Sequence, residues 1–348
     1  MGMSGGGAVR AMPWAAGVAL VLLLAPPGWS QTCSTASDLD AATRQGLEQA
    51  ARQYFAYVAQ GNTAALQQNA IASVAGNFRG IESAVKEHAA ELQAAQPSVR
   101  SSFLLDAPGP GTLARAEFLC GIFGPEGLTP YSVVFVLNDL PPGRYAVAIL
   151  DASTPQGADA AAFVLQQEPA MTGAWKLAGL YLTVTRLGEH DGKWFWEQGR
   201  AFQAKGQTLN AWLYYGLARD LLRPLPFITT AELVKFDDEQ QRLVPPAGVP
   251  LKEPAELIAE GGRSFKITQM FPVPDQKDAA AGLDLVADYQ VADVSDTGKA
   301  YADNLAVIHA LAAKYPELLQ GFAALGARAV DPAGRSYGTV VQGKELRP

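Results

Sequence analysis

The sequence is poor in the nitrogen and sulfur ligands of metal sites, with only three histidines and two cysteines among 348 residues. His88, His190 and His309 fall in different expected elements, and none stands at metal-ligand spacing from another histidine or a cysteine. We also expect no phosphate-binding glycine loop, dinucleotide fingerprint, serine-hydrolase elbow or zinc-protease pair. The sequence therefore predicts no metal site and no cofactor. It leaves the catalytic residues of any enzyme unknown.

Basic residues are in the minority and form no run along the chain. The sequence has 27 lysines and arginines against 34 aspartates and glutamates, a formal net charge of −7. This composition lacks the basic footprint of a nucleic-acid-binding protein. The absence of basic clusters also argues against an anionic membrane surface as the main partner.

One apolar run, near the N-terminus, is too short to span a membrane. It covers residues 11–25, follows the single charge of Arg10 and ends at two prolines. A helix needs roughly 20 residues to cross the hydrocarbon core of a bilayer, so this order is typical of a cleavable secretory signal at residues 1–30. Gly28 and Ser30 predict cleavage before Gln31. An uncleaved amphipathic or hydrophobic terminus is the alternative.

The product of this cleavage has a formal charge of −8, with 26 basic and 34 acidic residues. We expect a periplasmic or extracellular globular protein of two or three domains, with no transmembrane segment after cleavage and an oligomeric state that the sequence does not indicate. An oxidising compartment permits a disulfide between Cys33 and Cys120. A buried Cys120 beside a free Cys33 is the open alternative.

Apolar residues recur first at helical spacing and then at every second position, as in strands. This order predicts an α+β domain at residues 31–187. A helix between Ser37 and Gln60 should bury Leu47, Ala51, Tyr54, Phe55 and Val58. Two further helices are expected, from Thr63 and through Ile81 to Leu92, before Pro97 ends the helical region. Strands are expected at 113–123, 131–138, 144–151, 160–168 and 174–187, with the turn NDLPPGR joining the middle pair.

The segment YFAYVAQGNTAALQQ, in which one helix ends at Gly-Asn and another begins, precedes this strand-rich half. With it, the sequence over residues 38–187 resembles the nuclear transport factor two-like or cystatin-like superfamily. The resemblance implies a curved, cone-like sheet whose mouth holds a small ligand, and in some members isomerase, dehydratase or hydrolase activity. Such enzymes need acid–base groups in an apolar pocket. Because acidic side chains are mostly exposed, we expect solvated faces and turns for Asp106, Glu117, Asp139, Asp151 and Glu168.

The segment from Asp191 to Pro224 resembles a single tetratricopeptide repeat, a helix–turn–helix unit. Small and aromatic residues at its packing positions carry the resemblance: Gly199, Phe202, Gly206, Ala211, Tyr215 and Ala218. The small residues should let two helices approach closely, with Gln207 exposed in the turn. One repeat forms no concave groove, so we expect the hairpin to pack against its neighbours; partner binding is the alternative.

The hairpin and a capping helix are expected to fill residues 188–243. The capping helix should begin at Thr229 or Thr230, where Thr229 and Glu232 can form a capping box. A proline-rich linker at 244–258 then separates a small α+β domain at 259–348, for which we recognise no family. Expected there are strands at 264–271, 283–292, 325–331 and 335–342, and a helix at 297–323 interrupted at Pro316. The buried stripe expected on this helix is Tyr301, Leu305, Ile308, Ala312 and Tyr315.

Two functions of different classes remain. We expect an exported, non-catalytic envelope or periplasmic protein that binds a small apolar ligand or an envelope protein. The alternative is a small-molecule enzyme of the isomerase, dehydratase or hydrolase type, using an apolar pocket in the domain at 31–187. Convergent polar side chains with shifted pKa values on a pocket floor would favour the enzyme, whereas a closed apolar interior would favour binding.

We predict that the exported protein begins at or near Gln31 and is purified without detergent, because the short apolar run is removed with the signal. N-terminal sequencing of the exported form checks the cleavage site. A mature chain that retains Arg10, or that requires detergent, would contradict the prediction.

Overall fold

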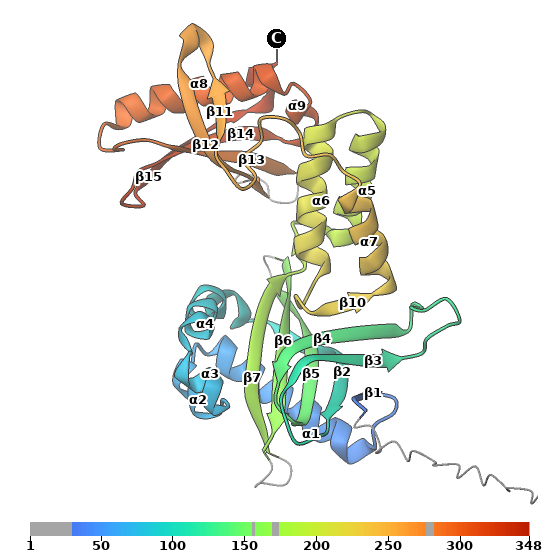
Figure 1. Ribbon diagram of the computed structural model, residues 1–348. Helices are drawn as coiled ribbons and strands as arrows, with labels where there is room; N and C mark the ends of the chain where they lie inside the picture. The colour runs from blue at the N-terminus through green and yellow to red at the C-terminus, as the bar shows by residue number, and fades with distance from the viewer. Residues whose placement is uncertain (1–29, 155–156, 169–173, 276–281, 348) are drawn as a thin grey trace, which may run out of the picture.

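The computed structural model describes residues 30–154, 157–168, 174–275 and 282–347. The predicted secretory signal lies outside these residues. Helices and mostly antiparallel sheets make the chain an α+β protein, as the sequence predicts. Figure 1 shows two α+β units with a helical hairpin between them. No helix in the described ranges is long and apolar enough to cross a membrane.

The N-terminal unit starts with a short strand and four helices: β1 (Thr32–Thr35), α1 (Ala41–Ala59), α2 (Thr63–Gln68), α3 (Ala72–Gly76) and α4 (Arg79–Leu92). The Asp40 side chain caps α1 by accepting a hydrogen bond from the Thr43 backbone N–H. The buried face of α1 consists of the five residues that the helical spacing predicts. Local periodicity therefore suffices to orient this helix.

Six strands follow in the chain: β2 (Gln96–Ala107), β3 (Leu113–Gly121), β4 (Ser132–Leu140), β5 (Gly143–Thr154), β6 (Gly157–Gln167) and β7 (Trp175–Val184). A seventh, β10 (Ile228–Thr230), joins the unit from a later part of the chain. They form a five-stranded sheet with the order β1-β2-β5-β6-β7 and a three-stranded sheet with the order β10-β4-β3. A two-stranded ribbon of β8 (Arg186–Leu187) and β9 (His190–Asp191) leads out of the unit.

Two expectations for these strands are wrong. β4 and β5 do not pair as a hairpin but lie in different sheets; Pro141 and Pro142 between them cannot donate backbone hydrogen bonds to a continuous ladder. The expected strands do not include β2, because the sequence predicts only a helix end at Pro97, whereas Pro97 is the second residue of this strand. A proline at the start of a strand is tolerated, and β2 pairs with β1 and β5.

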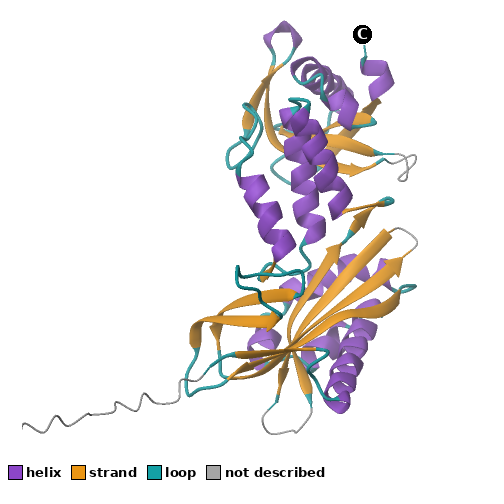
Figure 2. Cartoon of the chain, turned by 90° about the vertical axis from the view of Figure 1, so that its right-hand side faces the viewer, coloured by secondary structure: helices purple, strands orange, loops and turns teal. Residues whose placement is uncertain are grey.

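Three layers result, with the helices on one face of the five-stranded sheet and the three-stranded sheet on the other (Figures 1 and 2). One core lies between α1, α4 and the five-stranded sheet. A second core lies between the two sheets and includes Phe118, Phe135 and Val147. Cys33 on β1 and Cys120 on β3 form a disulfide, with their Cα atoms 5.0 Å apart, so a covalent bond also joins the two sheets.

The central hairpin consists of α5 (Gly192–Ala204) and α6 (Thr208–Leu222). Gly206 in the turn has a φ of 72°, a conformation that favours glycine. A Cβ atom at Gly199 would lie only 2.7 Å from Cδ2 of the Tyr215 ring. Ala211 and Ala218 are buried in the same helix pair, so small residues set the close approach. Membership of the tetratricopeptide-repeat family stays a prediction.

Gln207 is buried rather than exposed in the turn. Its Nε2 donates a hydrogen bond to Oε1 of Gln320, and its own Oε1 accepts one from Nδ2 of Asn210. The expected capping box at Thr229 is also wrong. Thr229 lies in β10, and Thr230 caps α7 (Ala231–Gln241) by accepting from the backbone N–H of Leu233.

The C-terminal unit is a five-stranded sheet with helices: β11 (Ala255–Ile258), β12 (Ser264–Pro274), β13 (Leu283–Gln290), α8 (Thr297–Lys314), α9 (Leu318–Gly321), β14 (Ala324–Val330), β15 (Ser336–Gln342) and α10 (Gly343–Leu346). β13 and β14 are parallel, with α8 in the crossover between them, and the other pairs are antiparallel. The expected stripe on α8 is partly wrong. Ile308 is buried, but Tyr301 is 49% exposed, and the sheet side of α8 carries Ala300, Asn304, Val307 and Leu311.

The hairpin and the C-terminal sheet share one hydrophobic core, in which Phe195 and Tyr215 belong to the same cluster as Leu285 and Ile308. The last four residues of the expected linker, 255–258, form β11 of that sheet. Leu222 at the end of α6 packs against both this core and the core between the two N-terminal sheets. The hairpin thus connects the two units through packed side chains. The domain boundaries themselves stay predictions.

Removal of the disulfide by Cys33→Ala and Cys120→Ala is expected to lower the free energy of unfolding by up to roughly 4 kcal/mol, because the bridge restricts a long loop of the unfolded chain. Urea unfolding of the double variant and the wild type measures the difference. Thiol labelling of the denatured, unreduced wild type should find no free cysteine. Two reactive thiols per chain would contradict the bridge.

Ala211→Leu is expected to lower the free energy of unfolding by about 1–3 kcal/mol, because it inserts three heavy atoms between closely packed helices. Ala204→Leu is the matched control, since Ala204 is exposed at the end of α5 and surface changes stay within about 0.5 kcal/mol. Thermal or urea unfolding compares the two. Equal stability of Ala211→Leu and the wild type would show that α5 and α6 do not pack as described.

Candidate functional site

The space in which a ligand pocket was expected is filled by the N-terminal unit's own side chains. Tyr54, Phe55 and Phe163 are buried between the helices and the five-stranded sheet. The Tyr54 hydroxyl lies 2.9 Å and 2.8 Å from the carbonyl oxygens of Asn69 and Trp175, and burial raises its pKa to about 12. It is a fixed neutral donor, unsuited to acid–base chemistry near neutral pH.

The carboxylates in or beside the strands form no cluster of three potential ligands in the described part of the chain: Asp106, Glu117, Asp139, Asp151 and Glu168. Asp151 pairs with Arg100 across neighbouring strands. Glu117 lies 3.6 Å from Arg115 on the exposed side of β3. These pairs are surface ion pairs, as expected of solvated strand faces.

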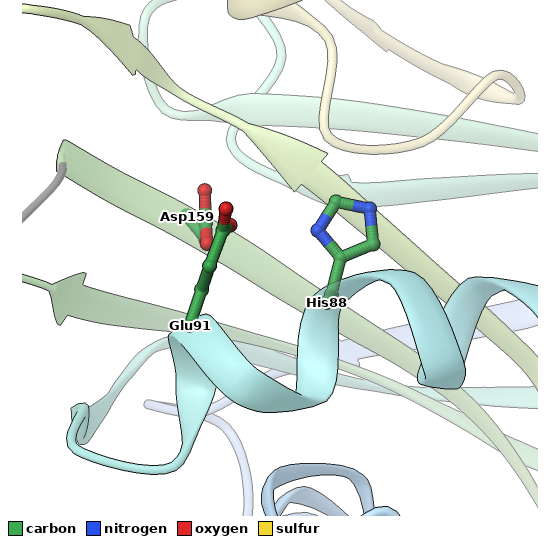
Figure 3. Close-up of side chains that lie close together, drawn as sticks. All are labelled: His88, Glu91 and Asp159. Carbon is green, nitrogen blue, oxygen red and sulfur yellow. The ribbon is translucent and has the colours of Figure 1, made fainter.

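One group of three potential ligands does form, between α4 and β6. His88 and Glu91 are three residues apart on α4 and therefore share a helix face. Asp159 lies opposite them on β6, on the same sheet face as Phe163. The three side chains point toward one another in Figure 3, and their ligand atoms all lie within 4.8 Å of one another. Imidazole and carboxylate groups in this arrangement can bind a cation or exchange protons.

Within the described residues, no lysine or arginine forms an ion pair with the carboxylates of this cluster. Glu91 is exposed, His88 is half-buried and Asp159 is 7% exposed. Burial raises the pKa of Asp159; the nearby His88 lowers it and Glu91 raises it further. The protonation of a buried carboxyl between an imidazole and a second carboxylate depends on the charge placed beside it.

His88 and His309 adjoin apolar helix faces in the sequence, which predicts buried core histidines at both positions; the structure places both differently. His309 is exposed on α8. His88 adjoins two carboxylates, one of which is 71 residues away along the chain. The spacing His88-x-x-Glu91 was the only local signal for this cluster, and it is common on helices. His190 stacks on Trp194 with ring centroids 3.6 Å apart, so it belongs to the aromatic packing of the hairpin.

Residues 334–338 have the G-x-S-x-G spacing of a serine-hydrolase elbow. The expectation that the sequence contains no such spacing is therefore wrong. The elbow needs a sharp turn from a strand into a helix. Here Ser336 instead begins β15, directly after the β14–β15 turn. The spacing therefore lacks the structure that would activate the serine.

The side of α8 away from the sheet lines an open groove of about 1350 Å³. The groove runs between α8, β11, α9 and α10, and its apolar surface includes Ile258, Ala302, Leu305, Leu319 and Leu346. Leu305 and Ala312 belong to the stripe that the sequence predicts as buried, yet they face this groove. α8 is thus apolar on two faces, and only one of them is packed on the sheet.

A smaller apolar surface lies at the β3–β4 hairpin, where Leu119, Ile122 and Tyr131 are 56%, 67% and 76% exposed. Figure 1 shows the end of this hairpin projecting from the unit. Single exposed apolar side chains are common on protein surfaces. The groove beside α8, in contrast, is concave and lined by several elements.

No family model, no curated protein and no solved structure matches the chain. Any function must therefore be argued from the side chains described above.

Proposed function

We propose that the chain is an exported, non-catalytic binding protein, periplasmic or extracellular, whose protein partner docks in the groove beside α8. The observation that carries the proposal is the second apolar face of α8, which lines a groove of about 1350 Å³. A helix that is apolar on both faces is normally covered on both. The filled interior of the N-terminal unit supports binding over the alternative, an enzyme with a pocket between its helices and sheet.

The shape and charge of the groove favour an amphipathic helix as the occupant. Ala302, Ala306 and Ala313 present small side chains, so the backbone of a partner helix can come close to α8. Glu256 and Glu260 lie on one wall and Lys314 on α8. Arg263 also lines the groove, but it is paired with Asp303. The partner helix should therefore carry basic residues on one flank and an acidic residue on the other.

Export is supported by two independent observations. The N-terminal order of one arginine, a short apolar run and small residues is typical of a secretory signal. The disulfide between Cys33 and Cys120 is a kind of bond that persists in oxidising compartments. Placement of the protein in the periplasm or outside the cell is part of the proposal.

A photo-crosslinking amino acid at Leu305 is expected to trap one discrete protein in the native exported compartment. Ala302→Arg should reduce the yield at least about tenfold, because a charged side chain then occupies the groove and is desolvated on docking. Ala302 is exposed, so this variant should keep the wild-type melting temperature.

The same crosslinker at Tyr131 is the matched control, since it lies on the other exposed apolar surface. A specific adduct from Leu305 that is absent from Tyr131 supports the groove. An adduct from Tyr131 alone, or one from Leu305 that Ala302→Arg leaves unchanged, would contradict it.

A further inference from the structure

Asp159 differs from two other buried carboxylates, Asp288 and Asp331, in the absence of a compensating donor. Asp288, which is 6% exposed, accepts two hydrogen bonds from the guanidinium of Arg328. Asp331, which is 4% exposed, accepts from Arg335 and from the backbone N–H of Ala333. Asp159 is 7% exposed, and no hydrogen bond or ion pair to it is found within the described ranges.

The surroundings of Asp159 increase the cost of its burial. The neighbouring titratable groups are the imidazole of His88 and the carboxylate of Glu91 (Figure 3). Two carboxylates at this distance repel each other, and a buried charge without hydrogen bonds is unfavourable. The backbone places these groups together through α4 and β6, two elements fixed by packing against a common core. A bound cation would satisfy all three side chains at once.

We propose that His88, Glu91 and Asp159 bind a divalent transition-metal ion, for which Zn²⁺ is the best match. Nitrogen and oxygen ligands lie about 2.0–2.2 Å from Zn²⁺, so the ligand atoms of one ion are about 3–4 Å apart. The separations within 4.8 Å approach this geometry. The exposed side chain of Glu91 is free to rotate toward a bound ion.

The donor set decides the class of ion. One imidazole nitrogen with two carboxylate oxygens suits Zn²⁺ and its first-row neighbours, whereas Ca²⁺ and Mg²⁺ prefer oxygen ligands alone. Three protein ligands leave a fourth position open to water or to a group of a bound molecule. The ion would also link α4 to β6. This inference is independent of the groove beside α8 and of its partner.

Calorimetric titration of EDTA-treated, dialysed protein with ZnCl₂ tests the site. We expect one ion per chain, and a Kd that rises at least about tenfold in His88→Gln and in Asp159→Asn, since even outer-shell changes at zinc sites cost about 10–100-fold. His309→Gln is the matched control, because it removes an exposed histidine from the other unit and should leave the Kd unchanged.

Melting temperatures separate loss of binding from loss of folding. In EDTA, Asp159→Asn should melt at or above the wild type, because it removes an uncompensated buried charge. In excess Zn²⁺ the order should reverse, because only the wild type gains stability from the ion. Absence of binding to the wild type, equal Kd values in the wild type and both site variants, or binding abolished by His309→Gln would overturn the proposal.

Discussion

The contact between Gly199 and Tyr215 is the constraint on which the arrangement of the chain depends. With hydrogen alone at Gly199, the Tyr215 ring occupies the space of a side chain, and α5 and α6 come close enough to bury Ala211 and Ala218. The two helices then carry one continuous apolar surface into the C-terminal sheet. At the other end, Leu222 enters the core between the N-terminal sheets.

A single carboxylate secures the same hairpin by polar contacts. Glu239 on α7 accepts hydrogen bonds from the indole of Trp196, the guanidinium of Arg200 and, at 3.3 Å, the hydroxyl of Tyr215. The hydrogen bonds from Arg200 lower the pKa of Glu239 most, against the opposing effect of burial. Donors from two helices thus converge on a carboxylate of a third. Glu239 has a structural role, because donors within the fold use its acceptor oxygens. Asp159, by contrast, has no such donor among the described residues, which distinguishes a candidate ligand from a structural carboxylate.

Sequence reasoning succeeded where the information was local and failed where it depended on distant residues. The buried face of α1 follows from 3.6-residue periodicity alone. α8 is apolar on two faces, so periodicity could not decide which face packs on the sheet, and the predicted stripe includes the exposed Tyr301. Gln207 was expected in solvent because a turn residue is normally exposed. It is buried instead, and its side chain donates a hydrogen bond to Gln320, 113 residues away.

The candidate metal ligands show the same limit most clearly. His88 and Glu91 could be paired from their spacing, but Asp159 joins them only because β6 lies beneath α4 in the folded unit. A strand residue near a turn is ordinarily solvated when acidic; here the helix covers it. The layered packing that fills the interior therefore also creates the cluster at its margin. Side chains of the core fill the spaces between the layers of the N-terminal unit. Its polar side chains can therefore converge only where a helix and a sheet meet at the surface, as His88, Glu91 and Asp159 do.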